Sequence, residues 1–550
     1  MAFSTVTSST VVIGAGPAGL AAAYELTKQN QAVTLLEQSD KVGGRSRYES
    51  DQGYTFDLGG HPFTTSIEAV RLLWNDLIPD DRVRVSAPAR IVYRHRFFDY
   101  PLSLTNALKH IGPFDGTQST LSYLAAQVQS VLNPTESVET AEGWLQKRFG
   151  SHLYSLFFGP YLQKVLGLLG SQVHSDWVAT RLPGESLPRT MGRALTCQSS
   201  ASSGHASSGS SSKTAFDYPV LGPGMLWERC RTRIELAGGN VRVRSRVVQI
   251  ERTGQRIDRV IVEKTTGRAP VAPDSGQQIA GQQIAGQGMA EQGMAEQQQV
   301  SLSSLSGDQF ISSLPLVDLI LQLDPPAPPA IRRAAERLKY RALISVPILL
   351  DNASLFPSRC LYIHSPEYKV ARIQNFKNWS AAMVPDASKT CLGMEYFCSE
   401  GDDLWARSNA ELIHLASEEL VELGLVPDRS SIQWGKVLRV PKAYPLYDDE
   451  YYKPLAMVQD YLEGFENLQT VGCTGLHRDL KHDFSTLTGL LAAQNILTGQ
   501  STNTPSAETS SAEAPSAGHR SNGHQYDLWS LGSGLEKGRS LRSSGTVLMG

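Results

Sequence analysis

A glycine-rich turn between an apolar strand and an apolar helix constrains the fold of this chain more than any other feature. Residues 11–13 are a β-branched run typical of a buried parallel strand. Gly14, Gly16 and Gly19 then form the pattern G-x-G-x-x-G, which leads into a helix over 20–26. The first glycine permits a tight turn, the second lets a pyrophosphate approach the backbone, and the third lets helix and strand pack closely. This pattern predicts dinucleotide binding at the helix N-terminus.

A carboxylate follows at the spacing expected for a dinucleotide-binding site. A second strand over 32–36 ends at Glu37, 23 residues after Gly14. In dinucleotide-binding folds an acidic residue about 20 residues beyond the glycine turn accepts hydrogen bonds from the adenosine ribose. We therefore predict an α/β fold with a doubly wound Rossmann-type domain.

A second glycine pair indicates which dinucleotide is bound. Gly43, Gly44 and Arg45 follow Glu37 after five residues. This Glu-x5-Gly-Gly-Arg pattern resembles the FAD enzymes of the amine oxidase, protoporphyrinogen oxidase and phytoene desaturase superfamily. The resemblance implies that the two glycines and the arginine lie against the flavin end and the pyrophosphate of FAD. We expect the FAD to be bound non-covalently, because no Cys or His stands in a recognisable flavin-linkage motif. A plain loop turn is the alternative for the glycine pair taken alone.

Composition and charge narrow the class of protein. A length of 550 residues suggests two or more domains, and a formal charge of −3 predicts no bulk attraction to nucleic acid or anionic membrane. The six cysteines include no C-x-x-C pair, so we expect free thiols in a reducing compartment and no metal site. No run approaches the ~20 apolar residues of a membrane span, and the N-terminus does not resemble a signal peptide. We expect a cytoplasmic enzyme with a small-molecule substrate.

Strand and helix patterns predict two interleaved domains. A hairpin over 91–101 precedes a helical region over 104–178, and strands over 241–251, 260–263 and 310–314 would complete the cofactor sheet. Strands over 341–350 and 391–398 are expected in a separate sheet. The predicted FAD-binding segments are 1–85, 215–267, 301–330 and 465–500, and the predicted segments of a mixed α+β substrate domain are 86–197 and 331–464.

Three segments have the composition of disordered chain. They are a Ser/Gly insert at 198–214, an insert with tandem pentapeptides at 268–300, and a tail rich in Ser, Gly and Thr at 501–550. Such segments cannot bury enough apolar surface to offset their ordering entropy. We assign them no function.

The last strand and helix of the expected FAD-binding domain bear on the charge of the flavin. A strand over 468–471 and a Gly-rich turn precede a helix over 485–497, which Ser485 or Thr486 can cap. A helix N-terminus aimed at the flavin would favour the negative charge of the reduced flavin. An ordinary packing helix is the alternative.

Further motifs resemble the UDP-galactopyranose mutases and their close relatives. They lie in the family's order at 56–63, 98–102, 149–150, 160–165, 176–181, 221–228, 443–445, 475–478 and 483–485. In that family the N5 of a reduced flavin attacks the anomeric carbon of UDP-galactopyranose, UDP leaves, and the opened sugar ring recloses as the furanose. The resemblance implies that Arg181 and Arg372 bind the diphosphate, that His61 lies by the N5 edge, and that Tyr444 lines the diphosphate site. Taken alone, each arginine would be interpreted as a surface ion pair and His61 as a loop histidine.

These patterns define the candidate site. The predicted catalytic residues are His61, Arg181, Arg372 and Tyr444. The predicted FAD-binding residues are Gly14, Gly16, Ala18, Gly19, Glu37, Gly43, Gly44, Arg45, Gly59, Gly60, His61, Val247, Gly472, Asp483, Ser485 and Thr486.

The sequence departs from the mutase pattern on the substrate side. Cys473 stands where relatives carry an active-site arginine, and Asp479 stands where they carry a tyrosine that hydrogen-bonds the diphosphate. Residues 482–485 read His-Asp-Phe-Ser instead of the family's Gln-Asp-His-Ser. A desolvated carboxylate at 479 would repel a diphosphate. The sequence analysis predicts an isomerase that acts on a nucleotide sugar through the reduced flavin N5, with an altered substrate site. The alternatives, in order, are an FAD-dependent oxidoreductase of an amine, porphyrinogen or polyene, and a FAD-binding protein without catalysis.

Overall fold

A parallel five-stranded sheet carries the N-terminal glycine turn. The computed structural model describes residues 9–60, 62, 64–102, 104–133, 138–181, 215–266, 299–501 and 526–529. The sheet has the order β21-β13-β1-β2-β9. Its strands are β1 (Ser9–Ile13), β2 (Ala32–Leu36), β9 (Asn240–Arg242), β13 (Gln309–Ser312) and β21 (Leu468–Thr470). Because β1 is central and the chain winds outward from it in both directions, the predicted doubly wound α/β fold is confirmed.

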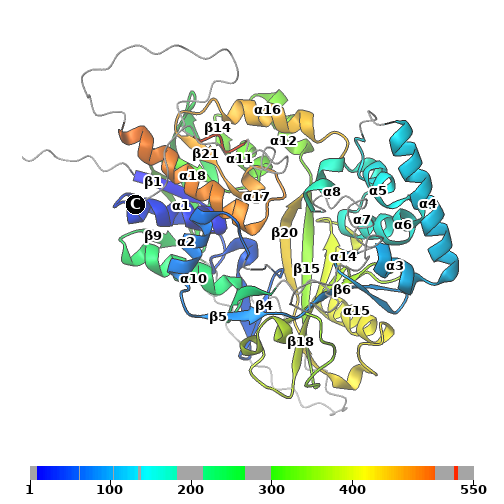
Figure 1. The fold of residues 1–550 in the computed structure, drawn as a ribbon. Coiled ribbons are helices and arrows are strands. Elements are labelled where there is room, and N and C mark those ends of the chain that lie inside the picture. The colour runs from blue at the N-terminus through cyan, green and yellow to red at the C-terminus, as the bar shows by residue number, and fades with distance from the viewer. Residues whose placement is uncertain are drawn as a thin grey trace, which may run out of the picture.

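Four helices pack together beside this sheet, at the left of the molecule in Figure 1. They are α1 (Pro17–Lys28), α2 (Glu68–Leu77), α10 (Pro223–Leu236) and α18 (His482–Ser501). Their shared core includes the fully buried side chains of Leu20, Trp74 and Trp227. α1 and α18 approach very closely, because a Cβ added at Gly489 would lie 1.9 Å from the carbonyl oxygen of Ala18. Only a glycine permits this contact.

A second sheet corrects one prediction from the sequence. Its strands are β10 (Ser245–Thr253), β11 (Arg256–Thr266), β12 (Gln299–Ser306) and β14 (Leu323–Asp324), in the order β12-β11-β10-β14. The expectation that 241–251 and 260–263 complete the cofactor sheet was therefore wrong except at 241–242, which belong to β9. β10 and β11 pair with each other in antiparallel fashion and bury one face, with Val247 and Val260 inward and Arg259 outward. Residues 299 and 300, expected within the low-complexity insert, begin β12.

An eight-stranded sheet forms the centre of the other half. Its strands are β6 (Ala89–Tyr93), β7 (Arg96–Asp99), β15 (Tyr340–Leu350), β16 (Cys360–Ile363), β17 (Arg372–Asn375), β18 (Thr390–Cys398), β19 (Ile432–Gly435) and β20 (Leu438–Pro445). The predicted separate sheet over 341–350 and 391–398 is thus confirmed. The predicted hairpin is formed by β6 and β7 and turns at Arg94 and His95, which both have positive φ. Helix α15 (Asn409–Glu422) packs against this sheet.

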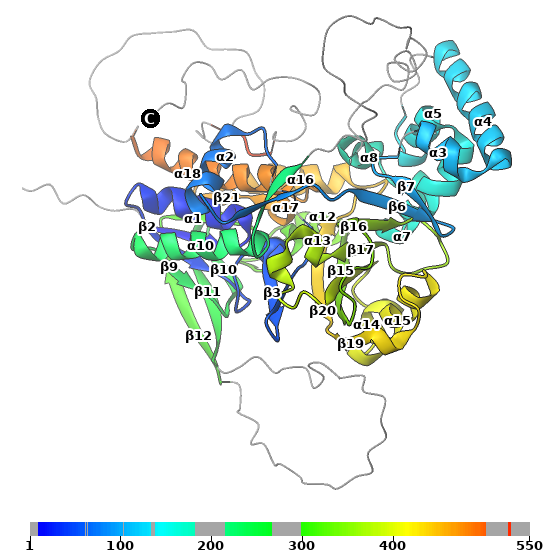
Figure 2. The same ribbon diagram turned by 60° about the horizontal axis from the view of Figure 1, so that its bottom comes forward.

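A helical lobe lies beside the eight-stranded sheet, at the right of Figure 1 and the upper right of Figure 2. It consists of α3 (Leu104–Ile111), α4 (Pro113–Leu132), α5 (Ala141–Phe149), α6 (Ser151–Leu153), a π-helical turn (Tyr154–Phe158), α7 (Gly159–Leu166) and α8 (Ser175–Arg181). No helix among the described residues is long and apolar enough to cross a membrane.

Shorter elements connect these layers. The remaining strands are β3 (Tyr48–Asp51), β4 (Tyr54–Asp57), β5 (Arg82–Val85) and β8 (Phe216–Pro219). The remaining α-helices are α11 (Leu316–Leu321), α12 (Pro329–Arg337), α13 (Phe376–Trp379), α14 (Asp403–Ala406), α16 (Tyr452–Leu462) and α17 (Gly472–Gly475).

A short stretch of the C-terminal tail contradicts the prediction that 501–550 contributes no core. Leu528 and Trp529 are buried, and Tyr526 exchanges two hydrogen bonds with the side chain of Asn495 in α18, at 2.8 and 3.0 Å. Large apolar side chains within a polar segment are enough to anchor it locally. The insert at 198–214, residues 268–298, and the rest of the tail beyond 501 lie outside the described residues.

The close packing of α1 and α18 gives the first testable prediction. Gly489→Ala is expected to lower the free energy of unfolding by about 1–3 kcal/mol, because the new methyl group collides with backbone. Gly499→Ala, in the same helix, is the matched control: a Cβ there meets nothing within 4 Å, and alanine favours the helix. Denaturant unfolding measures both variants. Equal stability of the two would contradict the close contact.

Candidate functional site

A cavity of about 1060 Å³ lies where the cofactor sheet meets the eight-stranded sheet. Its lining comes from the carboxyl ends of β1, β2, β13 and β21, from β17 and β20, and from the ends of α8 and α17. Ligands of doubly wound folds bind at this edge, where the strand order reverses. The cavity is therefore the candidate site.

The three glycines of the N-terminal turn occupy three different environments. A Cβ at Gly14 would lie 2.2 Å from Ser313 Oγ, and a Cβ at Gly19 would lie 2.0 Å from the Gly14 carbonyl oxygen. A Cβ at Gly16 would meet nothing within 4 Å, and Gly16 lines the cavity. The turn and the helix contact thus exclude side chains at two positions, whereas the middle glycine leaves open space at the N-terminus of α1.

The second glycine pair docks on the first turn. The Gly43 amide donates to the Ala15 carbonyl oxygen at 2.7 Å, and a Cβ at Gly44 would lie 3.1 Å from the Gly16 Cα. Both Gly43 and Gly44 have positive φ. The two backbones therefore form one continuous wall, which larger residues would separate.

Glu37 is fixed at the adjacent edge of the cavity. Its buried carboxylate accepts hydrogen bonds from the Ala15 amide at 2.8 Å and from the Ser39 amide and hydroxyl, each at 2.9 Å. The carboxylate is held in place beside the glycine turn, where a ribose would lie. α1 has no side-chain cap, so its first amides are open to an anion. The open space at Gly16, these amides and Glu37 together fit a dinucleotide.

Most of the predicted site residues line this one cavity. They are Gly14, Gly16, Ala18, Glu37, Gly44, Arg45, Gly60, Arg181, Val247, Arg372, Tyr444, Gly472 and Ser485. Gly19, Gly43, Gly59, Asp483 and Thr486 do not line it. His61 lies outside the described residues.

The proposed cap of the last helix was wrong. α18 begins at His482, so Ser485 and Thr486 lie within its first turns, and the Thr486 hydroxyl donates to the His482 carbonyl oxygen at 2.9 Å. The helix starts earlier because the His482 ring is packed between Trp74 and Trp227, and Trp227 donates to its Nε2 at 3.1 Å. Burial lowers the pKa of His482 to about 3, so this ring is a neutral acceptor.

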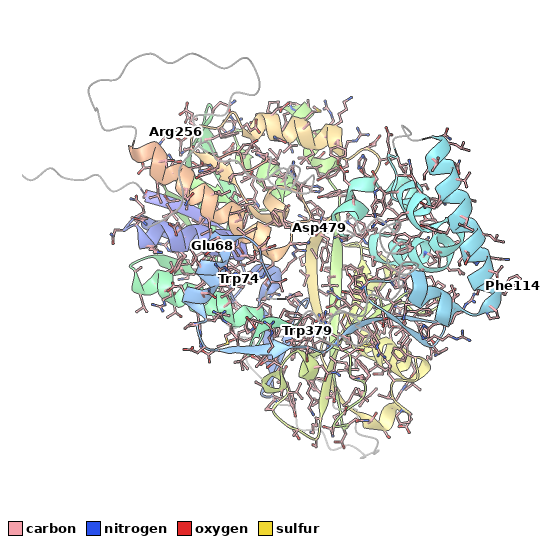
Figure 3. All side chains as sticks on the ribbon, in the orientation of Figure 1. Glu68, Trp74, Phe114, Arg256, Trp379 and Asp479 are labelled. Carbon is pink, nitrogen blue, oxygen red and sulfur yellow. The ribbon has the colours of Figure 1, made fainter. Side chains whose placement is uncertain are left out.

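Arg181 faces a carboxylate across the cavity wall. Its guanidinium forms an ion pair with Asp479 and lies 3.7 Å from the centre of the Trp177 ring. Desolvation lowers the pKa of Arg181 to about 10, and the tyrosines around it act in the opposite direction. The Asp479 amide donates to the Tyr447 hydroxyl at 2.9 Å, which fixes the loop that carries the carboxylate. Figure 3 shows Asp479 near the centre of the molecule, between the cofactor half and the helical lobe.

Arg372 is also paired. Its Nε donates to Glu395 Oε2 at 2.5 Å, and Gln374 donates to the other oxygen of this fully buried carboxylate. Burial lowers the pKa of Arg372, but the adjacent Glu395 outweighs this and holds the pKa well above its ordinary value. Sequence reasoning missed Glu395. The signal was present, since it is the one charged residue in the apolar strand β18.

Tyr444 and Arg45 join the two halves of the site. The Arg45 guanidinium lies 4.7 Å from the centre of the Tyr444 ring and donates to the Ala443 carbonyl oxygen in β20. The cofactor-side turn is thus tied to a substrate-side strand.

Asp57 is a further buried acid that sequence reasoning did not single out. It ends β4, two residues before the Gly59–Gly60 loop, and is fully buried. Tyr218 donates to its Oδ2, whereas Oδ1 has no hydrogen-bond partner among the described residues. Burial raises the pKa of Asp57 to about 7. Gly60, in the adjacent loop, lines the cavity, and a Cβ there would lie 2.5 Å from Gln374 Oε1.

Comparison with known proteins decides the family. The family model described as flavin containing amine oxidoreductase matches residues 17–497. The chain belongs to this family. The prediction of FAD as the cofactor is confirmed, and the glycine turns, the N-terminus of α1 and Glu37 are the residues that would hold it.

Individual relatives match shorter stretches or share the fold. The chain is 28% identical over 169 residues to mitochondrial protoporphyrinogen oxidase of Nicotiana tabacum, covering 28% of this chain and 32% of that protein. It is 45% identical over 87 residues to a lycopene-forming phytoene desaturase of Pseudescherichia vulneris, covering 16% and 17%. These matches span about a third or less of the relatives' own length. The crystal structure of reduced UDP-galactopyranose mutase shares the fold, with a TM-score of 0.70, 18% identity, and coverage of 90% of this chain and 96% of that one.

Replacing Gly16 should separate FAD binding from folding in this amine oxidoreductase family member. Gly16→Val is expected to abolish FAD binding, because its side chain fills the open space beside the α1 amides. The apoprotein should melt like the wild-type apoprotein. Gly19→Ala is the comparison, since its Cβ collides with the Gly14 backbone and should lower the melting temperature. Flavin released on denaturation and thermal unfolding measure the two effects. A Gly16→Val protein that keeps its FAD would refute the assignment.

The buried Asp57 predicts a pH-dependent stability. The folded chain keeps a proton on Asp57 up to pH about 7, whereas the unfolded chain releases it near the ordinary pKa of 3.8. This group therefore destabilises the fold increasingly as the pH rises between those values. The stability of Asp57→Asn relative to wild type should rise in that window, by up to about 1.4 kcal/mol per pH unit. Denaturant unfolding at several pH values measures it, and a pH-independent difference would contradict the burial of this acid.

Proposed function

We propose that this chain is an FAD-dependent oxidoreductase that takes a hydride from an organic substrate lacking a diphosphate. The observation that carries this proposal is the pairing of both candidate diphosphate-binding arginines, Arg181 with Asp479 and Arg372 with Glu395. A diphosphate requires cations that are available for charge-assisted hydrogen bonds. Two arginines that already neutralise carboxylates supply little net positive charge to the cavity.

The residues of the chain have distinct roles in this proposal. Bound FAD would supply the two-electron acceptor for the hydride. The paired glycine turns and Glu37 hold the cofactor, and Arg45 fixes the turn against β20. Tyr444 and the two ion pairs form the polar wall that orients the substrate, while Leu314, Val440 and Phe484 give the cavity an apolar part. An amine, a porphyrinogen or a polyene are the substrate classes that this surface suits.

Isomerisation of a nucleotide sugar is the second candidate. It is favoured by the presence of Arg181, Arg372 and Tyr444 on a single cavity, the set that the resemblance to the mutases assigns to the diphosphate. A UDP-sugar that bound there would have to displace Asp479 from Arg181. This exchange loses a charged pair before it forms another, so the wild-type chain is expected to bind UDP weakly.

Removing the carboxylate of Asp479 frees Arg181 from its ion pair and so tests which of the two candidate functions is right. We expect the dithionite-reduced wild-type holoenzyme to bind UDP only weakly in isothermal titration calorimetry. Asp479→Asn, or Asp479→Tyr, which restores the family residue, should gain about tenfold or more in affinity. One charge-assisted hydrogen bond is worth about 1.5–3 kcal/mol.

A second carboxylate of the same cavity provides the control. Asp318 pairs with Lys442, so Asp318→Asn removes an equal charge without releasing Arg181 and should leave UDP binding unchanged. Tight UDP binding by the reduced wild type, accompanied by conversion of UDP-galactopyranose to the furanose, would establish the isomerase instead.

A further inference from the structure

The outward face of α4 carries a stripe of large apolar side chains. Six of them are at least half exposed: Phe114 (73%), Leu121 (62%), Leu124 (50%), Val128 (59%), Val131 (78%) and Leu132 (72%). Their spacings of seven, three, four, three and one residues place them on one side of a helix. Figures 1 and 2 both show α4 at the outer edge of the helical lobe, and Figure 3 shows Phe114 at the rim of the molecule. We call these six residues the α4 stripe.

The helix lacks the charges that normally face water. Of the twenty residues of α4, only Asp115 is charged. Its carboxylate is occupied by Arg94 at 3.4 Å and lies 3.5 Å from His152, on the side of the helix that packs on the lobe. Ser119 and Tyr123 are buried and face the core. Since Asp115 also lies on the inward side, the outer face of α4 carries only apolar and uncharged polar side chains. An exposed apolar patch of this extent indicates a contact surface.

Basic residues lie next to one end of the stripe. The turn between β6 and β7 presents Arg94, His95 and Arg96, all exposed, and the Arg94–Asp115 contact places this turn at the start of α4. Arg96 donates to the His110 carbonyl oxygen at 2.7 Å and has no carboxylate partner among the described residues. Asp115 balances one of the two arginine charges, so a small net positive charge, contributed by Arg96, remains beside the end of the stripe that carries Phe114.

We propose that the α4 stripe docks on the surface of an anionic lipid bilayer, with α4 lying in the plane of the interface. Apolar side chains would enter the acyl boundary, and the arginines would face anionic headgroups. A protein partner would need a surface matched to roughly 20–30 residues on each side, of which the six apolar residues of the stripe would form only the centre. A bilayer needs no such matched surface, so charge and extent favour lipid over a second copy of the chain.

Vesicle binding by the full-length holoenzyme tests this proposal. The wild type should co-sediment with mixed vesicles of phosphatidylcholine and phosphatidylglycerol, and more weakly with phosphatidylcholine alone. Leu121→Ser with Val128→Ser should reduce binding to the mixed vesicles by roughly tenfold or more, because two apolar anchors are lost. Arg94→Gln with Arg96→Gln should remove the preference for phosphatidylglycerol while leaving the weaker binding.

A matched double variant controls for exposed leucines in general. Leu72→Ser with Leu236→Ser changes two exposed leucines on α2 and α10, in the cofactor half, and should bind vesicles like the wild type. Flavin content and melting temperature confirm that each variant is folded. Absence of wild-type binding to mixed vesicles, or equal binding by the stripe variant, would overturn the proposal. So would a dimer in sedimentation velocity that the stripe variant abolishes, because a second copy would then cover the stripe.

Discussion

The contact between two glycine turns is the constraint on which the rest of the site depends. Gly43 donates to the Ala15 carbonyl oxygen, and a Cβ at Gly44 would lie 3.1 Å from the Gly16 Cα, so the second turn packs backbone to backbone on the first. The same contact sets the direction of Arg45, which reaches β20. A single close approach of backbone thus shapes the cofactor end of the cavity and aligns the substrate-side sheet with it.

The substrate end depends on charge rather than on close packing. The guanidinium groups of Arg181 and Arg372 lie at this end of the cavity, and each is paired with a carboxylate from a different part of the chain. Packing on Trp177 removes water from the Arg181 guanidinium. A desolvated charge is costly unless an opposite charge compensates it, so Arg181 requires a carboxylate or another anion beside it. With Asp479 present, that partner is part of the protein. This difference from the mutase pattern is why we propose oxidation of a substrate that lacks a diphosphate, within a shared fold.

Local sequence patterns predicted the elements whose structure is determined by residues close together in the chain. The glycine turn, the hairpin at Arg94 and His95, and the strands over 341–350 and 391–398 were predicted correctly, because spacing and turn chemistry encode them. The prediction failed where contacts between residues far apart in the chain determine the structure. Strands β10 and β11 leave the cofactor sheet, His482 extends α18 because two tryptophans hold its ring, and 526–529 attaches to Asn495. The sequence identified Asp479 as unusual but could not reveal that it faces Arg181.

Hydride transfer to the bound flavin distinguishes an oxidoreductase from an isomerase. The oxidised holoenzyme would be mixed anaerobically with amine, porphyrinogen and polyene substrates while the flavin absorbance is followed. For an oxidoreductase, one substrate class bleaches the flavin absorbance, and deuterium at the reacting carbon slows the bleaching with a primary isotope effect. If no class reduces the flavin, and the reduced enzyme instead interconverts the pyranose and furanose forms of a UDP-sugar, the proposed oxidoreductase function is contradicted.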